Sequence, residues 1–225
     1  YSLYPGKTHL AQSDYLHLQH FLDVTKANMF FAKGIIMVEG WAEAILIPAI
    51  ARAMGKDLTL SEVSIVNIGS TAYLHFAKIY MPTDQVMEMP VAIITDLDIR
   101  PDINGSFNQE VENDQRQKIS SQIDTIHYSN IQINIAYQWT LEWCLFNSKT
   151  YRDAFMTAVS TVHYGTAEFK KDEEGNWVNE GHFRVKLITK LIDKSLNKVA
   201  IAYNLANWIT EHEVAPLEDD PYIEY

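Results

Sequence analysis

Short apolar runs recur along the first 140 residues, and each is bounded by glycine, proline or polar residues. Runs of this length that are rich in Val and Ile are typical of buried strands. Longer segments with apolar residues at helical spacing separate them. Alternation of strand and helix predicts an α/β fold with a mostly parallel sheet flanked by helices, to which the C-terminal part adds a helical subdomain. The predicted strands are 35–38, 63–68, 90–95 and 131–136.

The helical patterns divide the chain further. The predicted helices are 15–31, 42–54, 73–81, 110–128, 147–163 and 196–212, and the polar stretch 168–181 is expected to be an exposed hairpin or loop. From these we predict an N-terminal tether and helix (1–29), a core (30–146), a helical insert with a polar loop (147–190), and a C-terminal helix that returns to the core before an acidic tail (191–225). The tail is expected to be disordered or a contact point in a longer chain.

Composition narrows the class of protein. The chain has 225 residues, of which 47% are hydrophobic, so a well-filled core is expected and wholesale disorder is excluded. One cysteine excludes an internal disulfide framework and fits a reducing compartment. No apolar run approaches ~18 residues, so no membrane contact is expected. A chain that begins with Tyr1 rather than Met is expected to be a piece of a longer protein.

Net charge bears on possible partners. The formal charge of −11 argues against nucleic-acid binding by bulk electrostatics, since such domains usually carry a basic surface. It does not argue against a nuclease whose acids are neutralised by divalent ions, because the ions change the local field.

Acidic residues follow two of the predicted strands. Glu39 ends the first strand and Glu43 lies in the first turn of the next helix, where an i, i+4 relation would stack the two carboxylates. Asp96 and Asp98 follow the third strand, and a period of two would point them the same way. Ligands gather outside the carboxyl ends of parallel strands, and hard divalent cations prefer carboxylate oxygens. The sequence therefore predicts a metal site.

These motifs carry a family resemblance. Val38-Glu39-Gly40-x-x-Glu43, Val66-Asn67-Ile68-Gly69-Ser70 and Thr95-Asp96-Leu97-Asp98, in this order, resemble the Toprim domain of topoisomerases, primases and related nucleases. Thr140-Leu141-Glu142-Trp143 further resembles the OLD (overcoming lysogenisation defect) family of ATP-dependent endonucleases. The resemblance covers about residues 30–145, and more weakly 197–208.

The resemblance implies a role for each matching residue. Glu39 would be a metal ligand or general acid/base, Asp96 and Asp98 the metal-binding pair, and Glu43 and Glu142 the ligands that complete the shell of a second ion. Lys198 would stabilise charge on the phosphate in the transition state. Three other lysines remain alternatives for that role, namely Lys186, Lys190 and Lys194.

The resemblance also implies an activity and its surroundings. We expect a two-metal DNA endonuclease, active in nicking and cleavage, that uses Mg²⁺ or Mn²⁺ and accepts Ca²⁺ as an inactive substitute. An N-terminal ABC-type ATPase domain is expected in the full-length chain, with a helicase as a candidate partner. A bacterial cytoplasmic location and a role in phage defence are the corresponding expectations.

Two other functions stay open at the level of sequence. A HAD-like phosphohydrolase would use Asp96 as nucleophile. That family has the motif D-x-D-x-[TV], whereas here Ile99-Arg100 follow Asp98, so Arg100 stands in place of Thr or Val. A non-catalytic metal-binding module that regulates an ATPase is the second, since Trp143-Cys144 stand where a further acid is frequent in the family.

Overall fold

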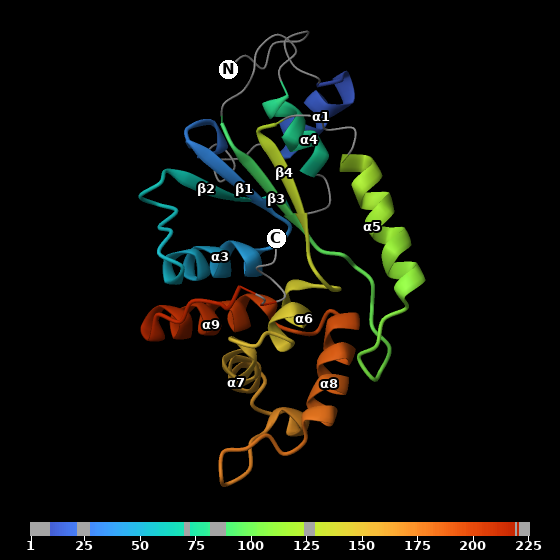
Figure 1. Ribbon diagram of the computed structural model, residues 1–225, viewed down its shortest axis with the longest axis vertical. Helices are drawn as coiled ribbons and strands as arrows, with labels where there is room; N and C mark the ends of the chain where they lie inside the picture. Colours follow the sequence, from blue (N-terminus) through green and yellow to red (C-terminus); the bar gives the residue numbers. More distant parts are fainter. Residues whose placement is uncertain are drawn as a thin grey trace.

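The structure is a computed structural model that describes residues 10–21, 28–69, 73–81, 89–123, 129–218 and 220 (Figure 1). Its centre is a parallel sheet with strand order β2-β1-β3-β4. The strands are β1 (Gly34–Val38), β2 (Val63–Asn67), β3 (Val91–Thr95) and β4 (Ile131–Ile135). The predicted α/β class and all four predicted strands are confirmed.

Strand β1 is central because both of its neighbours pair with it in parallel register. Ile35 pairs with Ser64 of β2 and with Val91 of β3. In a parallel sheet each connection crosses over, so the carboxyl ends of all strands meet at one edge. The residues that follow β1, β3 and β4 are therefore neighbours in space, although they are far apart in the sequence.

Helices cover the sheet and extend beyond its carboxyl edge. They are α1 (Gln12–Phe21), α3 (Trp41–Ala53), α4 (Tyr73–Ala77), α5 (Gln109–Ile123), α6 (Leu141–Phe146), α7 (Arg152–Val162), α8 (Glu180–Ile192) and α9 (Lys198–His212). Short 3₁₀ turns are η1 (Asn28–Phe30), η2 (Lys78–Tyr80) and η3 (Ala167–Phe169). Figure 1 shows α3 and α9 side by side at the carboxyl edge, with α6, α7 and α8 beyond them.

Two hydrophobic clusters hold these layers together. One lies where α1 and α4 pack on the sheet, and it contains Met37, Phe76 and Ile93. The other joins α3 to the four C-terminal helices, and Leu46 and Leu205 belong to it. Because α9 shares this second cluster with α3, the C-terminal helix is fixed directly beside the helix that follows β1.

Several predicted elements differ in extent. The helix predicted over 15–31 is α1, which begins at Gln12; residues 28–30 form a 3₁₀ turn, and 22–27 lie outside the described residues. Helix α7 begins at Arg152 rather than at 147, because Ser148 Oγ accepts the backbone N–H of Tyr151 at 2.8 Å in a preceding turn. The predicted tether lies almost wholly outside the described residues, and the predicted domain boundaries stay predictions.

The C-terminal part contains two features that the hydrophobic pattern did not predict. Helix α8 was not predicted as a separate element, because the polar stretch 168–181 overlaps its first residues and hides where its helical pattern begins. That stretch does form a turn, closed by a β-bridge between Lys171 and Trp177. In the predicted acidic tail, Asp220 is buried and accepts the Ser148 hydroxyl at 2.6 Å. A disordered tail is therefore wrong at this residue, while 219 and 221–225 lie outside the described part.

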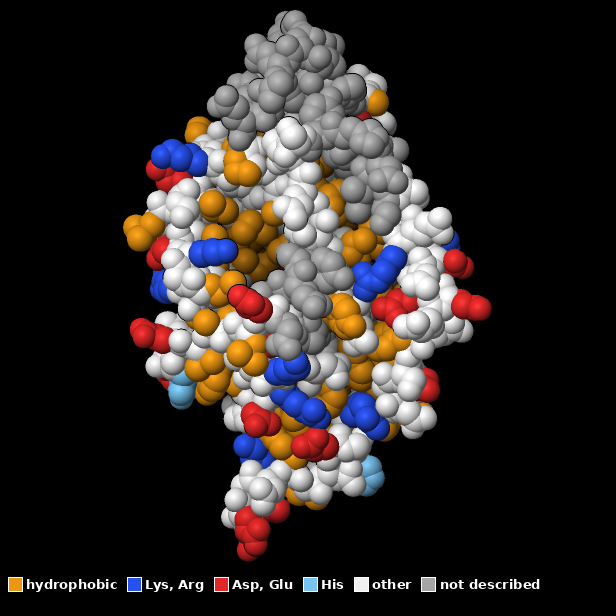
Figure 2. Space-filling view, viewed as in Figure 1, with side chains coloured by type: hydrophobic (Ala, Val, Ile, Leu, Met, Phe, Trp, Pro, Cys, Tyr) orange, Lys and Arg blue, Asp and Glu red, His pale blue; other side chains and the backbone are white. Residues whose placement is uncertain are grey.

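The surface of the face in Figure 2 mixes acidic, basic and apolar side chains, with Lys and Arg gathered over the lower half of the view. Within the part of the chain that the structure describes, no helix combines the length and the apolar character that crossing a membrane requires.

Anchoring of α9 can be tested by deleting its core contact. Leu205 is fully buried in the second cluster, so Leu205→Ala is expected to lower the free energy of unfolding by about 2–5 kcal/mol. Tyr203, on the same helix, is 60% exposed, so Tyr203→Ala should change it by no more than about 0.5 kcal/mol. Urea denaturation of both variants measures the difference. Equal losses would contradict the packing described here.

Candidate metal and active site

Glu39 and Asp96 meet at the carboxyl ends of two adjacent strands. Glu39 follows β1, and its Oε1 accepts hydrogen bonds from the hydroxyl of Thr95, at the end of β3, and from the backbone N–H of Asp96 at 3.3 Å. The Glu39 carboxylate is therefore held across the strand pair, beside the first residue of the Asp96–Asp98 pair.

Glu43 reaches the same region from the first turn of α3. The helix begins at Trp41 with Gly40 as its N-cap, so Glu39 precedes the helix and the predicted helical stacking of Glu39 on Glu43 is wrong in detail. A Cβ atom on Gly40 would lie 2.8 Å from Glu43 Oε2. The Glu43 carboxylate folds back over the N-cap, and a side chain at residue 40 would push it out of this position. Glu43 is buried despite its charge.

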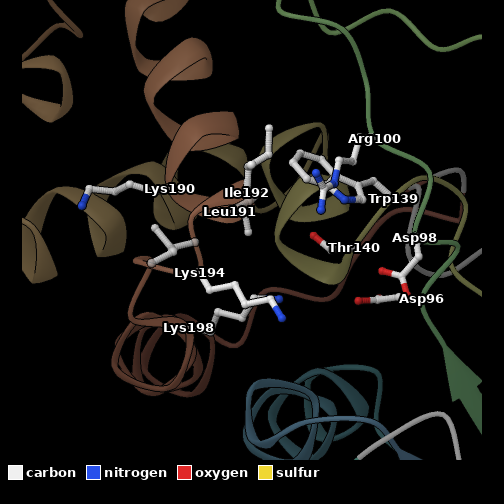
Figure 3. Close-up of a pocket in the computed structure, with 11 residues that line it drawn as sticks. Asp96, Asp98, Arg100, Trp139, Thr140, Lys190, Leu191, Ile192, Lys194 and Lys198 are labelled. Atoms are coloured by element: carbon white, nitrogen blue, oxygen red, sulfur yellow. The ribbon is translucent and has the colours of Figure 1, made fainter.

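Asp96 and Asp98 line one pocket of about 590 Å³ (Figure 3). The sequence analysis assumed that strand periodicity points the two aspartates the same way. Strand β3 ends at Thr95, however, so Asp96 and Asp98 lie beyond the strand. Instead Asp98 has a left-handed backbone (φ 59°) and its N–H donates to Trp139 O at 2.9 Å. Asp96 Oδ1 accepts the Leu141 N–H at 3.2 Å. Both acids are thus fixed by the segment that follows β4.

Glu142 and Lys198 form an ion pair inside the same cluster, with Glu142 Oε2 2.8 Å from Lys198 Nζ. The Glu142 side chain is 3% exposed and the Lys198 side chain 41%. Glu142 Oε1 has no hydrogen-bond partner among the described residues. Of the alternative lysines, Lys186 pairs with Glu168 at 3.4 Å instead.

Three helices begin at this cluster. Glu43 lies in the first turn of α3 and Glu142 in the first turn of α6, where the positive end of the helix dipole favours a carboxylate. Lys198 opens α9, where the dipole disfavours a cation. The attraction of the buried Glu142 therefore has to hold the Lys198 ammonium in place.

Burial and mutual repulsion raise the pKa values of the acids. Desolvation raises the pKa of Glu39, Glu43 and Asp96, with Asp96 raised well above its ordinary value. The neighbouring charges of Glu142 and Glu43 add to the effect on Asp96. Desolvation alone would lower the pKa of Lys198, but the surrounding carboxylates, with Glu142 first, outweigh it and raise the pKa. All four groups sense one another electrostatically.

Comparison with known proteins agrees with this geometry. Residues 30–98 match the family model described as "Overcoming lysogenization defect protein-like, TOPRIM domain". These residues include β1, β3 and the acids Glu39, Glu43, Asp96 and Asp98. The predicted resemblance to an OLD-like TOPRIM domain is thus confirmed for residues 30–98.

Relatives of this OLD-like TOPRIM domain extend over more of the chain. Endonuclease GajA of Bacillus cereus (strain HuB5-5) is 24% identical over an alignment of 165 residues, which covers 67% of this chain and 23% of that protein. The chain thus spans about a quarter of the length of this relative.

Solved structures show the same fold. The C-terminal region of the Burkholderia pseudomallei OLD protein superposes with a TM-score of 0.51 and 23% identity, covering 87% of this chain and 94% of that one. The C-terminal region of the Xanthomonas campestris pv. campestris OLD protein, phased with platinum, gives 0.51 and 22%, covering 83% and 88%.

The donor set of the OLD-like TOPRIM domain fits a hard divalent cation in its chemistry. Buried carboxylates with raised pKa values, and the unpartnered Oε1 of Glu142, are what a dication would neutralise. Across the described ranges, no three His, Cys, Asp or Glu side chains converge closely enough to form a ready cage. Mg²⁺ does not need one, since it usually keeps several waters and binds one or two carboxylates.

Some residues of the site were not singled out from the sequence. Thr95 fixes Glu39, and Gly40 makes room for Glu43. Arg100 lines the pocket, whereas the Asp102 side chain shapes the loop after it by accepting the N–H of Ser106 at 2.8 Å. The position of Thr95 directly before Asp96 was the available signal, since a hydroxyl at a strand end can reach the neighbouring strand.

Asp96→Asn is expected to stabilise the metal-free protein at neutral pH. A raised pKa means that the fold favours the protonated acid, so its stabilising contribution is complete at low pH and is lost as pH rises through the raised pKa. Asn mimics the neutral form and can still accept the Leu141 N–H. In EDTA at pH 7.5, the variant should gain on the order of 1 kcal/mol, and the gain should vanish below about pH 4.

A carboxylate with the opposite shift provides the control. Backbone N–H groups of Leu60 and Thr59 lower the pKa of Asp57, so its ionised form stabilises the fold above its ordinary pKa. Asp57→Asn should therefore give no gain at pH 7.5. Thermal unfolding from pH 4 to 8 measures both variants, and a pH-independent effect of Asp96→Asn would rule out the proposed crowding.

Proposed function

We propose that the chain is a metal-dependent endonuclease domain that hydrolyses DNA phosphodiester bonds and forms the C-terminal part of an OLD-type protein. The observation that carries the proposal is the gathering of buried and half-buried carboxylates from four segments around one lysine, Lys198. Neither an ordinary core nor a solvated surface has reason to concentrate acids in this way, because each pays for desolvation and repels the others.

The relatives support the nuclease part of the proposal. GajA is named an endonuclease, and two solved neighbours are named as C-terminal regions of OLD proteins. We therefore propose DNA as the substrate and an N-terminal ABC-type ATPase domain in the full-length chain. The helicase partner and the phage-defence role stay predictions from the family resemblance.

Each carboxylate has a place in the proposed two-ion arrangement. Glu39, Asp96 and Asp98 would hold one Mg²⁺ or Mn²⁺, and Glu43 and Glu142 would hold the second with help from the shared acids. Bound ions would acidify a water beside the scissile phosphate and neutralise charge on the leaving 3′ oxygen.

The chain's own groups orient these acids and act on the phosphate. The Thr95 hydroxyl and the Leu141 N–H fix the carboxylates of Glu39 and Asp96, so neither has to reorganise during the reaction. Glu39, held at the end of β1 by the Thr95 hydroxyl, would be placed to exchange a proton with the attacking water. Lys198, charged and half-buried, offsets negative charge that develops on the phosphate oxygens.

Removing one metal-binding acid tests the function directly. Asp96→Ala is expected to lower the rate of supercoiled-plasmid cleavage by at least about 10³-fold, because metal binding and activation of the attacking water both depend on Asp96. EDTA should have the same effect on the unmodified chain, and Mn²⁺ or Mg²⁺ should restore activity. Circular dichroism checks that the variant folds. Cleavage retained by a folded Asp96→Ala protein would eliminate this site.

The catalytic lysine can be identified by comparing two variants. Lys198→Gln should lower the single-turnover cleavage rate by about 10²–10³-fold, the usual loss for one charge-stabilising group. Lys186→Gln should leave the rate within about twofold, because Lys186 pairs with Glu168 away from the acids. Saturating DNA separates the rate from binding. A larger loss in Lys186→Gln would reassign the lysine.

A further inference from the structure

The pocket beside the acids has a second, basic wall. Asp96 and Asp98 line one side of its volume of about 590 Å³, and Arg100, Lys190, Lys194 and Lys198 also line it. In a chain whose net charge is −11, a local excess of cations next to a cluster of acids is a specific feature of this pocket.

Three of these cations have no acidic partner among the residues that the structure describes. Lys198 is paired with Glu142, whereas the side chains of Arg100, Lys190 and Lys194 form no ion pair or hydrogen bond within the described ranges. Figure 3 shows Lys194 extending beside Lys198 toward Asp96 and Asp98, and Arg100 lying by Trp139 on the other side. Lys190 points away from the acids in this view.

The backbone at Lys194 is unfavourable for a lysine. Lys194 follows α8 in a left-handed conformation (φ 54°), and its N–H donates to Leu191 O at 3.3 Å, as is common where a helix ends. Glycine usually occupies such a position, because other residues are strained there. The negative end of the α8 dipole favours a cation here, but the left-handed backbone costs a lysine more than it costs glycine, and the lysine places an ammonium group over the pocket.

We propose that Arg100 and Lys194 bind the phosphates of the DNA strand that flank the one being cut. This inference rests on the proposed function. A guanidinium suits bidentate binding of a phosphate, and an ammonium binds it as a point charge. Lys194 lies beside Lys198, and Arg100 lies by Trp139 on another part of the same pocket, so a strand that occupies the pocket passes both groups. Such contacts fix the position of the backbone and read no base sequence.

DNA affinity as a function of salt tests the inference without cleavage. Fluorescence anisotropy of a labelled duplex would be measured in EDTA between about 50 and 200 mM salt for the unmodified chain, Lys194→Gly and Arg100→Gln. Each variant is expected to bind roughly 5–10-fold more weakly and to lower the slope of log K against log salt by about 0.9, the value for one phosphate contact. The double variant should lower it by about 1.8.

Lys194→Gly separates binding from folding. Glycine accepts the left-handed backbone, so the melting temperature should not fall while the affinity does. Lys56→Gln serves as the matched control, because Lys56 is an exposed lysine just beyond the C-terminal end of α3, the end opposite Glu43. Its salt slope should equal that of the unmodified chain.

The outcomes separate this inference from the nuclease function. Unchanged slopes in Lys194→Gly and Arg100→Gln, an equal loss in Lys56→Gln, or no DNA binding by the unmodified chain would each overturn it. If the unmodified chain cleaves with Mn²⁺ while the two variants bind normally, the function stands and the flanking contacts fail. If the binding losses appear but no cleavage occurs, the phosphate contacts stand and the nuclease function fails.

Discussion

Crowding of negative charge at the carboxyl edge of the sheet is the constraint on which the rest of the structure depends. Glu43 and Glu142 are buried, and Glu39 and Asp96 are half-buried beside them. Several features offset the cost of keeping them there, namely the N-termini of α3 and α6, the hydrogen bonds to Glu39 and Asp96, and the ion pair with Lys198. None of these offsets the cost entirely, since desolvation first and the neighbouring charges second keep the pKa values of three of the acids raised. A site that is incompletely neutralised by its own chain has a physical reason to bind a cation.

The helices beyond the sheet hold the ion pair between Glu142 and Lys198 in place. Lys198 opens α9, against the dipole of its own helix, and it meets Glu142 only if α9 is held beside α3 and α6. The second hydrophobic cluster supplies that hold, because residues of α9 such as Leu205 and Ile209 pack in it with Leu46 of α3. Stability and site geometry are thus linked through the same contacts. A C-terminal segment that is remote in sequence thus interacts with acidic residues near the N-terminus.

The sequence predicts the features that depend on a local pattern of residues. It does not predict the contacts between residues that are far apart in the chain. The four strands and the acids that follow them could be predicted, because apolar runs and strand-end carboxylates are local signals. The need for a small residue at Gly40 could not be predicted, because it depends on where the Glu43 side chain folds back. The place of Arg100 on the pocket wall could not be predicted either, since it depends on how β3, β4 and α8 come together. Helix α8 was lost for a different reason, because the polar stretch before it hides where its pattern begins.

Backbone strain gives an independent reason to regard this pocket as functional. Within the described ranges, five residues other than glycine have positive φ, and three of them, Asp98, Trp139 and Lys194, line the pocket. Such conformations cost on the order of 1–3 kcal/mol each and persist only where the surroundings enforce them. Here the Asp98 N–H bonds to Trp139 O, so two of the strained residues hold each other in place. Glycine could have relieved the strain at all three positions but would have removed a carboxylate, an aromatic ring and an ammonium group from one wall. The chain keeps the strained side chains where chemistry on a phosphate would need them, which argues for a site rather than for an accident of packing.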